Sequence, residues 1–536
     1  MIERIILNAR LITLNPAQPH ASALAIAGGR IVAVGDDAAI RALAGPQTAI
    51  DNAGGRPVIP GLTDAHIHWE GVAENLSEVD VFEVPSKGEA LRRVAERVRT
   101  SQPGEWIVGR GWSQAYWPDQ AFPTAADLDT VAPHNPVYLT AKSGHAAWVN
   151  TAALRAAGLT ARTADPPGGS IVRDASGQPT GLLLESSAMD LVYRYVPTLT
   201  PEQTADWMAQ AQRRAWASGL TGIHDFDDPS CLVALQILRE RGELGLRVVK
   251  NINDPFIDHA HALGIRWGFG DEWLRIGGLK IFADGALGPR TASMIEPYEG
   301  EPGNTGIVVT DKEQMYELVS RASAAGIPST IHAIGDRAVH DVLDVYEAVR
   351  RDEAARGIPP QARRHRIEHV QLIHPDDAGR LGQLQIIASM QPIHATSDYE
   401  MAERYWGARA RMSYNWRVQL EAGAVLAFGS DAPVEPFEPL KGIYAAVTRR
   451  RPDGSPGPDG WFPEQRLDID TTLRAFTQGP AYAAGMERDL GMLAPGYLAD
   501  LVVLDRDLTA IPPDEILETQ VLGTMVGGVW RFRQFD

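Results

Sequence analysis

Two histidines lie two residues apart in the stretch VIPGLTDAHIHWEG, which runs from Val58 to Gly71. Side chains alternate across a β-strand, so His66 and His68 share one face of an extended segment. Two imidazoles on one face are consistent with a hydrogen-bonded core pair, with chance, or with half of a metal site. The rest of the chain must decide among these three interpretations.

Further residues that suit a metal recur near the ends of apolar runs. Lys280 lies in GGLKIFADG, His332 in IPSTIHAIGD, His369 in RIEHVQ and Asp431 in FGSDAP. Imidazole and carboxylate are ligands that suit Zn²⁺ and related divalent ions. Each residue alone also fits an ordinary role, as a hydrogen-bonded rim residue, an ion-pair partner or a helix cap. The joint pattern favours a metal centre.

The elements that must position these residues are strand-like runs that alternate with helical patterns. The first run carries His66, and the others are 219–226, 245–252, 276–285, 327–336, 365–371, 385–392 and 424–433. Strands that alternate with helices form parallel βαβ units, and eight of them predict an α/β fold with a closed (β/α)₈ TIM-like barrel. Because the strand ends of such a barrel converge at one mouth, the four histidines, the lysine and the aspartate would face one small volume.

The remaining segments predict two additions to this barrel. Residues 1–56 and 485–536 are both rich in strand patterns, with Gly-Gly pairs at 28–29 and 527–528 that indicate hairpins. We therefore expect one small β-sandwich domain built from both termini, with the metal-dependent barrel at 57–484. Residues 72–200 are long, turn-rich and aromatic, which predicts an insertion after the first barrel strand, over the barrel mouth.

Composition restricts the class of partner. The chain has 536 residues, 44% of them hydrophobic, and a formal net charge of -18, which argues against nucleic acid or an anionic membrane as a partner. A single cysteine, Cys231, excludes an intramolecular disulfide and a cysteine-based metal cluster. No apolar run reaches the ~20 residues that span a bilayer, and the start lacks the pattern of a secretory signal. We expect a cytoplasmic protein that acts on a small molecule, with a homodimer as a candidate assembly.

The motifs together resemble the amidohydrolase superfamily, and more narrowly amidohydrolase family 3. The resemblance rests on GLTDAHIH, GHAAWVN, LKIFADGALGPRTA, IHAIGDRAV, RIEHVQ, SMQPIH and FGSDAPVEP, and on LGMLAPGYLADLVVLD near the end. It implies one or two divalent ions, with zinc as the first expectation, although manganese, iron or cobalt would suit the same ligands. By this resemblance His66, His68 and Asp431 hold one ion and His332 and His369 hold the other.

The resemblance also implies roles in catalysis. Lys280 would be carboxylated on its amine and bridge two metals, and Asp431 would accept a proton and deliver it to the leaving nitrogen. The expected reaction is hydrolysis of a C–N bond, in an amide or N-acyl group of a partly apolar substrate, by attack of metal-bound hydroxide. A deaminase, a lactone or ester hydrolase on the same scaffold, and a regulatory protein with an inherited metal site stay open as alternatives.

A second group of residues is predicted from its position near the ligands. Asp336 is expected to orient His332, because ligating histidines need a partner for their other ring nitrogen. Each of the others has a structural alternative, in the insertion's own core or as support for a loop. The predicted substrate-binding residues are His145, Arg290, His394, Trp112 and Trp117.

Overall fold

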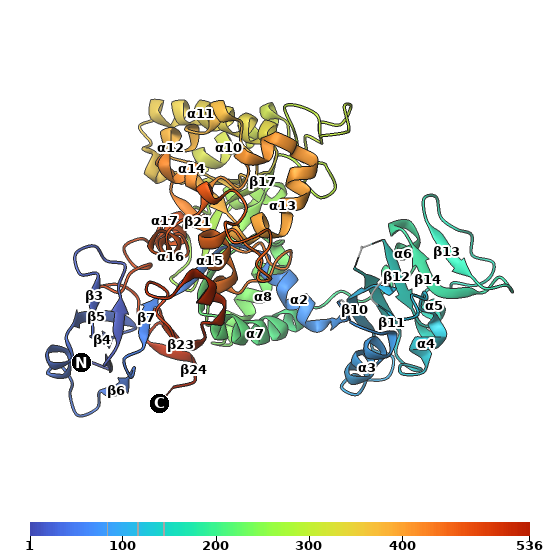
Figure 1. The fold of residues 1–536 in the computed structure, drawn as a ribbon, viewed down its shortest axis with the longest axis horizontal. Coiled ribbons are helices and arrows are strands. Elements are labelled where there is room, and N and C mark those ends of the chain that lie inside the picture. The colour runs from blue at the N-terminus through green and yellow to red at the C-terminus, as the bar shows by residue number, and fades with distance from the viewer. Residues whose placement is uncertain (83, 115–116, 143–144, 536) are drawn as a thin grey trace. The chain divides into compact units, whose positions relative to one another are not determined.

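The computed structural model describes residues 1–82, 84–114, 117–142 and 145–535, and the chain divides into two compact units (Figure 1). Residues 1–69 and 208–536 form the first, called here the barrel unit. Residues 70–207 form the second, called the inserted unit. Within the described residues, no helix combines the length and the apolar character needed to cross a bilayer.

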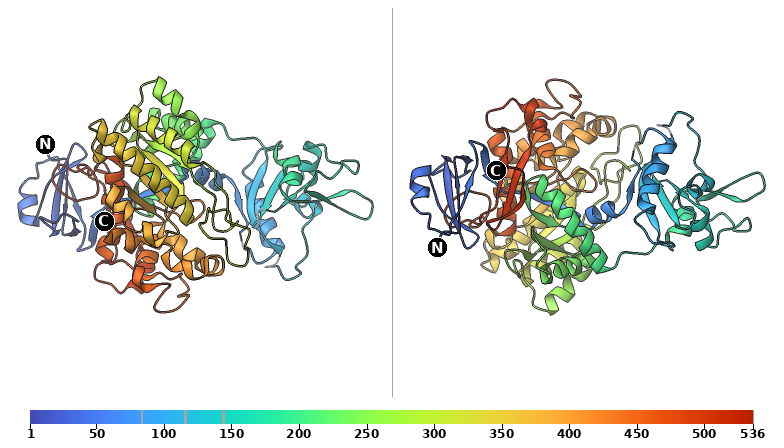
Figure 2. Two further views of the ribbon diagram at one scale, coloured as in Figure 1. Left: turned by 90° about the horizontal axis from the view of Figure 1, so that it is seen from above. Right: turned by 90° about the horizontal axis from the view of Figure 1, so that it is seen from below.

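The barrel unit is built around an eight-stranded sheet in which every paired neighbour is parallel (Figure 2). Each of the eight predicted runs overlaps one of its strands, so the predicted (β/α)₈ fold is confirmed. In chain order the strands are β8 (Leu62–Ile67), β15 (Leu220–Asp225), β16 (Arg247–Asn253), β17 (Leu274–Phe282), β18 (Ser329–Ala333), β19 (Arg366–His369), β20 (Ile387–Met390) and β21 (Leu426–Phe428).

The first and last strands of this sheet approach each other at one end. The backbone N–H of Asp431 donates to the carbonyl of His66 at 2.7 Å, and the N–H of His68 donates to the carbonyl of Ala432 at 2.8 Å. These bonds follow the ends of β8 and β21, so the barrel closes at its C-terminal mouth. The closure joins the same backbone segments that carry three of the predicted ligands.

Helices follow the strands and cover the outside of the barrel (Figure 1). On α11 the buried residues Val339, Val342, Leu343 and Tyr346 recur at helical spacing, which gives the helix one apolar face. The main helices are α7 (Pro201–Ala217), α8 (Pro229–Glu240), α9 (Ile257–Ala262), α10 (Lys312–Ala325), α11 (Asp336–Ala355), α12 (Arg380–Leu384), α13 (Pro392–Trp406), α14 (Trp416–Glu421), α15 (Pro439–Thr448), α16 (Ile469–Ala475) and α17 (Gln478–Ala484).

Both ends of the chain contribute to a β-domain within the barrel unit. One sheet has the order β5-β4-β1-β6 and the other β24-β23-β22-β7-β2-β3. The Gly-Gly pairs at 28–29 and 527–528 join β4 to β5 and β23 to β24, as predicted. The strands are β1 (Arg4–Leu7), β2 (Arg10–Ile12), β3 (His20–Ala21), β4 (Ala23–Ala27), β5 (Arg30–Gly35), β6 (Ala49–Asn52), β7 (Pro57–Pro60), β22 (Leu501–Leu504), β23 (Val521–Val526) and β24 (Val529–Arg533), with helix α1 (Asp37–Arg41) beside them.

Gly61 is the point at which the chain passes from this β-domain into the barrel. It separates β7, which pairs with β22, from β8, which pairs with β15. A Cβ at this position would lie 2.3 Å from Oγ1 of Thr221, a distance that packed atoms do not tolerate. Glycine is therefore required where the chain passes close to Thr221 on the second barrel strand.

The inserted unit has a six-stranded sheet of its own with the order β13-β14-β12-β11-β10-β9. Its apolar core includes Trp112, Trp117 and Trp148. The strands are β9 (Val79–Asp80), β10 (Ile107–Trp112), β11 (Val137–Ala141), β12 (Ala146–Val149), β13 (Ser170–Arg173) and β14 (Pro179–Leu184), and the helices are α2 (Trp69–Ser77), α3 (Lys87–Val98), α4 (Ala125–Asp129), α5 (Thr151–Ala156) and α6 (Ser186–Tyr193).

Candidate metal centre

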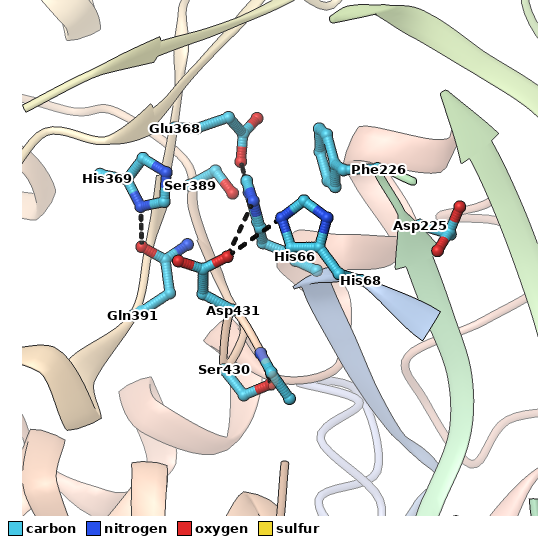
Figure 3. Close-up of polar contacts among 12 residues, drawn as sticks. His66, His68, Asp225, Phe226, Glu368, His369, Ser389, Gln391, Ser430 and Asp431 are labelled. Carbon is cyan, nitrogen blue, oxygen red and sulfur yellow. Dashed lines mark hydrogen bonds and ion pairs between the residues drawn. The ribbon is translucent and has the colours of Figure 1, made fainter. Parts of the chain in front are cut away.

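The barrel mouth brings one carboxylate between two imidazoles (Figure 3). Oδ1 of Asp431 lies 3.4 Å from Nε2 of His66 and 3.4 Å from Nε2 of His68. Ligand atoms of His66, His369 and Asp431 all lie within 4.8 Å of one another. Three side chains from different strands therefore converge at a separation that one metal ion could bridge.

The remaining predicted ligands line the same cavity, which has a volume of about 350 Å³. The ring of His332 lies 4.6 Å from the ring of His369, measured between centroids. Nζ of Lys280 lies over the rings of Phe226 and Phe282, at 4.8 and 4.4 Å. Burial lowers the pKa of this lysine to about 8. The structure thus collects all six predicted ligands around one cavity.

His66 is held by a carboxylate on the opposite side of its ring. Its Nδ1 lies 2.7 Å from Oε2 of Glu368. Arg366 donates to both oxygens of Glu368, at 2.6 and 2.9 Å. Burial raises the pKa of Glu368, but this guanidinium and His66 outweigh burial and hold it well below its usual range. The ionised carboxylate can only accept a hydrogen bond, so Nδ1 carries the ring proton and Nε2 of His66 is left with a lone pair.

That lone pair is evidence that a cation belongs at the site. Nε2 of His66 is buried and has no hydrogen-bond partner among the described residues. It faces the carboxylate of Asp431, which is also an electron-pair donor. Burial, the largest effect, lowers the pKa of His66 to about 4, so the imidazole is neutral at physiological pH. Two facing lone pairs repel unless a cation lies between them, so the residues present suit a divalent metal.

The other two imidazoles beside Asp431 are held in the same way. Nδ1 of His68 lies 3.0 Å from Oδ1 of Asp227, and Nδ1 of His369 lies 2.8 Å from Oε1 of Gln391. Both partners are acceptors, so in each neutral ring the proton sits on Nδ1 and Nε2 is free to ligate. Burial lowers the pKa of His68, but its two carboxylate neighbours outweigh burial and raise it to about 10, so a metal that binds Nε2 would displace a proton from this ring. The surroundings of His68 therefore attract a cation.

His332 has the opposite arrangement. Its Nε2 lies 2.9 Å from the carbonyl oxygen of Gly285 and 3.5 Å from Oδ1 of Asp284. Nε2 therefore donates to a backbone oxygen, and Nδ1 is the nitrogen left to bind a metal. Oδ1 of Asp336, the predicted partner of His332, accepts from the N–H of Ile295 instead. An orienting role for Asp336 stays a prediction.

Backbone strain marks two of the ligand positions. The φ angle is +76° at His369, +45° at Val370 and +62° at Asp431, in the left-handed region that side chains other than glycine rarely adopt. Each such residue costs about 1–3 kcal/mol. Adjacent residues of a regular strand face opposite sides. The positive φ at His369 breaks this alternation, so His369 faces the cavity while its neighbour Glu368 contacts His66. Strain of this kind concentrates at functional sites.

His394 faces the metal ligands from α13. Nε2 of Gln371, an amide donor, lies 3.1 Å from Nδ1 of His394, so Nδ1 must be the acceptor. The proton of the neutral ring is therefore on Nε2, which lies 3.7 Å from Oδ2 of Asp431. The side chain is 6% exposed, and this Nε2 has no hydrogen-bond partner among the described residues. It offers a proton where His66 offers a lone pair.

Comparison with known proteins agrees with this geometry. Residues 49–532 match the family-3 model of the amidohydrolase family. The chain belongs to the amidohydrolase family. It is 34% identical to the protein LONG AFTER FAR-RED 3 of Arabidopsis thaliana, covering 98% of this chain and 90% of that protein. It is 31% identical to N-substituted formamide deformylase of Arthrobacter pascens, covering 100% and 99%.

Solved structures support the same assignment. An uncharacterised metal-dependent hydrolase from Pyrococcus furiosus is 28% identical, with a TM-score of 0.78 over 94% of this chain and 99% of that chain. This amidohydrolase is therefore a hydrolase whose ligand set suits a divalent metal.

The amidohydrolase holds Arg290 in an ion pair rather than in the cavity lining. Its guanidinium lies 2.9 Å from Oε1 of Glu301 and over the ring of Tyr405 at 5.3 Å. The loop that carries it also contributes Leu287 and Gly288 to the cavity. A substrate-binding role for Arg290 stays a prediction.

Three predicted residues of the amidohydrolase belong to the inserted unit. Trp112 and Trp117 are 1% and 2% exposed and pack with Trp148, with ring centroids 6.1 to 6.3 Å apart. His145 is exposed, and its Nδ1 lies 2.9 Å from Oε2 of Glu185. The two tryptophans serve the core of their own unit, and contact of any of the three with substrate stays a prediction.

Sequence reasoning missed the residues that hold the imidazoles. Glu368, Asp227 and Gln391 all lie within three residues of a barrel strand's end, and Glu368 immediately precedes a ligand in RIEH. A search for acceptors next to strand-end histidines would have found Glu368. The contacts of all three residues cross between strands, so spacing along the chain does not reveal which imidazole each one holds.

Proposed function

We propose that this chain hydrolyses a C–N bond, in an amide or N-acyl group, of a small and partly apolar molecule. The observation that carries the proposal is the pair of unpartnered ring nitrogens around Asp431. His66 presents a lone pair and His394 presents a proton. Hydrolysis of an amide needs both an electrophile held by lone-pair donors and a hydrogen-bond donor for the carbonyl oxygen.

His66, His68 and Asp431 would hold one divalent ion, with zinc as the first choice. A second ion would use His332 and His369, with Lys280 as a carbamate between the two. When bound, the metal supplies Lewis-acid polarisation of the carbonyl and lowers the pKa of a water molecule. Support for the carbamate comes from the buried position of Lys280 in the cavity, where a free ammonium is disfavoured.

Asp431 would move the proton. Burial raises its pKa, but the surrounding imidazoles, including the hydrogen bond with His68, outweigh burial and hold the pKa well below the usual value. The carboxylate is therefore ionised and can accept a proton from the attacking water. Its Oδ2 faces the cavity toward His394, so the same group can deliver the proton to the leaving nitrogen.

His394 would donate from Nε2 to the substrate's carbonyl oxygen. Gln371 keeps Nδ1 as the acceptor, so the ring is held with its proton toward the cavity. A donor that is already in place when negative charge develops on oxygen stabilises the transition state without reorganisation. His394 would thus act beside the metal rather than as one of its ligands.

The apolar part of the cavity supports the substrate class. Beyond the ligands it is lined by side chains that include Phe282, Leu287, Ile334, Met401 and Val434. Such a wall favours a hydrocarbon substituent on the amide over a small polar amide. The Arthrobacter relative, N-substituted formamide deformylase, is named for a reaction of this class.

The test combines metal analysis with a panel of substrates. Purified protein should contain stoichiometric divalent metal, and N-formyl and N-acyl aryl amines should be hydrolysed faster than small polar amides. Product analysis should find an amine and a carboxylic acid. Release of ammonia from heterocycles, or of an alcohol from esters or lactones, as the faster reaction would replace the proposal, and protein without metal would refute it.

A further inference from the structure

Helix α13 presents a stripe of three side chains to the cavity. His394, Asp398 and Met401 lie at positions i, i+4 and i+7 and all line the cavity. Residues at this spacing share one face of a helix. With a rise of 1.5 Å per residue, Asp398 starts ~6 Å further along the helix than His394. The stripe therefore leads away from the metal ligands.

A second carboxylate lines the cavity near Asp398. Glu435 follows the last barrel strand and is half-buried. Burial raises the pKa of Glu435, a hydrogen bond with Ser397 and the nearby His394 oppose that rise, and the charges of Asp398 and Asp431 add to it. Neither acidic residue is used by the proposed hydrolysis. Two carboxylates close to each other in one cavity are an electrostatic cost that a bound cation relieves.

Basic side chains do not offset these charges. Among the cavity-lining residues that the structure describes there is no arginine, and Lys280 is the one lysine. Oδ2 of Asp398 accepts from the hydroxyl of Tyr414 at 2.7 Å. That bond fixes the carboxylate and uses one of its oxygens, so Oδ1 is left as an acceptor for a further donor.

The unpartnered Nε2 of His394 shows independently that a ligand belongs in this cavity. It is buried, carries the ring proton and faces inward from the same helix stripe as Asp398. A molecule that accepts from His394 and extends along the stripe reaches Asp398 next. The far end of that molecule then meets the carboxylate of Asp398, which is an acceptor.

We propose that the cavity selects amides whose far end carries a basic nitrogen, with His394 bound to the amide oxygen and Asp398 and Glu435 bound to the ammonium group. This inference rests on the proposed amide hydrolysis and names its substrate class. An ammonium group compensates the charge of both carboxylates, whereas a methyl group leaves that charge uncompensated and a carboxylate is repelled.

A purely structural role for Asp398 makes a different prediction. Tyr414 also lies 3.4 Å from Oε1 of Gln371, so Asp398 could serve only to position Gln371 and through it His394. Asp398→Asn keeps an oxygen acceptor for Tyr414 but removes the charge. If the role is structural, the asparagine variant changes kcat/KM for charged and neutral substrates by the same factor and keeps the wild-type preference for the ammonium compound.

Three amides of equal chain length make the test. They are N-acetylpentane-1,5-diamine, N-hexylacetamide and 6-acetamidohexanoate, which end in an ammonium, a methyl and a carboxylate group. In metal-loaded wild type we expect kcat/KM for the ammonium compound to exceed that for the methyl compound by about tenfold or more, because hydrogen bonds between charged groups are strong. The carboxylate compound should be the slowest.

The variants Asp398→Asn and Glu435→Gln should each reduce the ratio of kcat/KM for the ammonium compound to that for the methyl compound to about threefold or less. Glu400→Gln is the matched control, because Glu400 lies on the same helix, is exposed and does not line the cavity. It should leave the preference unchanged. Equal kcat/KM for all three amides in wild type, or a preference for the carboxylate compound, would overturn the inference.

Calorimetry separates this inference from the proposed hydrolysis. If none of the three amides is hydrolysed, calorimetric binding of the same compounds to the metal-loaded protein tests the cation site by itself. Tighter binding of the ammonium compound, lost in Asp398→Asn and kept in Glu400→Gln, supports the cation site although the proposed reaction has failed. Absence of a binding preference for the ammonium compound refutes the cation site.

Discussion

Nδ1 of His66 lies 2.7 Å from Oε2 of Glu368, and the two residues come from the first and the sixth strands of the barrel. Arg366 occupies both oxygens of Glu368 and also donates to the carbonyl of Ala65 at 2.7 Å. The ring of His66 is therefore fixed from across the barrel, and the protonation of its metal-facing nitrogen depends on a residue that touches no metal.

Glu368→Gln should weaken metal binding. The amide can still accept from His66, but it no longer forms a charged pair with Arg366, so the ring is held less firmly. Loss of such a partner costs roughly 10–100-fold in metal affinity, which competition with a chelator measures.

A second buried pair provides the control for Glu368. Oε1 of Glu353 lies 3.0 Å from Nε2 of His365, outside the cavity. Glu353→Gln should lower the free energy of unfolding as Glu368→Gln does, yet leave metal affinity unchanged. Equal metal affinity in the two variants would mean that Glu368 serves stability alone.

Asp431→Asn tests proton transfer. The amide keeps the shape and one oxygen ligand, but it cannot accept a proton. Turnover of an amide from the substrate panel should fall by roughly 10²–10⁴, while the thermal unfolding curve changes little. Metal content measured on the same sample separates loss of the proton acceptor from loss of the ion. Near-normal turnover would remove Asp431 from the proposed mechanism.

Much of this architecture could be predicted from the sequence. The eight strands were predictable because each is a short apolar run bounded by turn signals. Position at strand ends then sufficed to group His66, His332 and Asp431, since parallel strands of a barrel deliver their ends to one mouth. Both steps depend on regular geometry, which spacing along the chain encodes.

Other features depend on irregular geometry or on contacts between distant segments. Alternation along a strand places Glu368 and His369 on opposite faces, and the positive φ at His369 overrides that rule. The proton position on His394 follows from its contact with Gln371, which lies on a different segment. Spacing along the chain contains no information on either point.

Gly61→Ala should destabilise the junction between the β-domain and the barrel. The new Cβ would lie 2.3 Å from Oγ1 and 2.6 Å from Cγ2 of Thr221, so the strands must separate. We expect a loss of about 1–3 kcal/mol in the free energy of unfolding.

Thr221→Gly in the same chain should recover part of that loss in a double-mutant cycle. Gly303→Ala is the control, because a Cβ there meets nothing within 4 Å. Additive effects of Gly61→Ala and Thr221→Gly would argue against the steric clash.

Acid should remove the contribution of Glu353. Burial raises its pKa, but hydrogen bonds from His365 and Ser323 outweigh burial and lower it to about 2. Because the folded value lies below the ordinary ~4.3, the ionised form stabilises the fold above that pH. This stabilisation is lost as the pH falls from about 4.3 toward 2. The difference in unfolding free energy between wild type and Glu353→Gln should therefore narrow over that range. A difference that stays constant would contradict the lowered pKa.

Two substitutions of Lys280 separate loss of a ligand from loss of volume. Lys280→Ala leaves space in the cavity, whereas Lys280→Met fills most of it without offering a ligand atom. Both variants should lose activity and at least part of the bound metal if the lysine serves as a carbamate. The methionine variant is the control for chemical rescue, because no small molecule can enter the space that its side chain occupies.

Rescue of Lys280→Ala by short carboxylic acids tests the carbamate directly. The group that the alanine variant lacks is a carboxylate at the end of an apolar stem, so formate, acetate or propionate added with excess metal should restore part of the activity. Lys280→Met should not respond. Wild-type apoprotein should need bicarbonate together with metal to regain activity in buffer depleted of CO₂. If reactivation proceeds equally without bicarbonate, and the alanine variant still binds two metal ions, the lysine is not a carbamate and the centre needs a different bridging group.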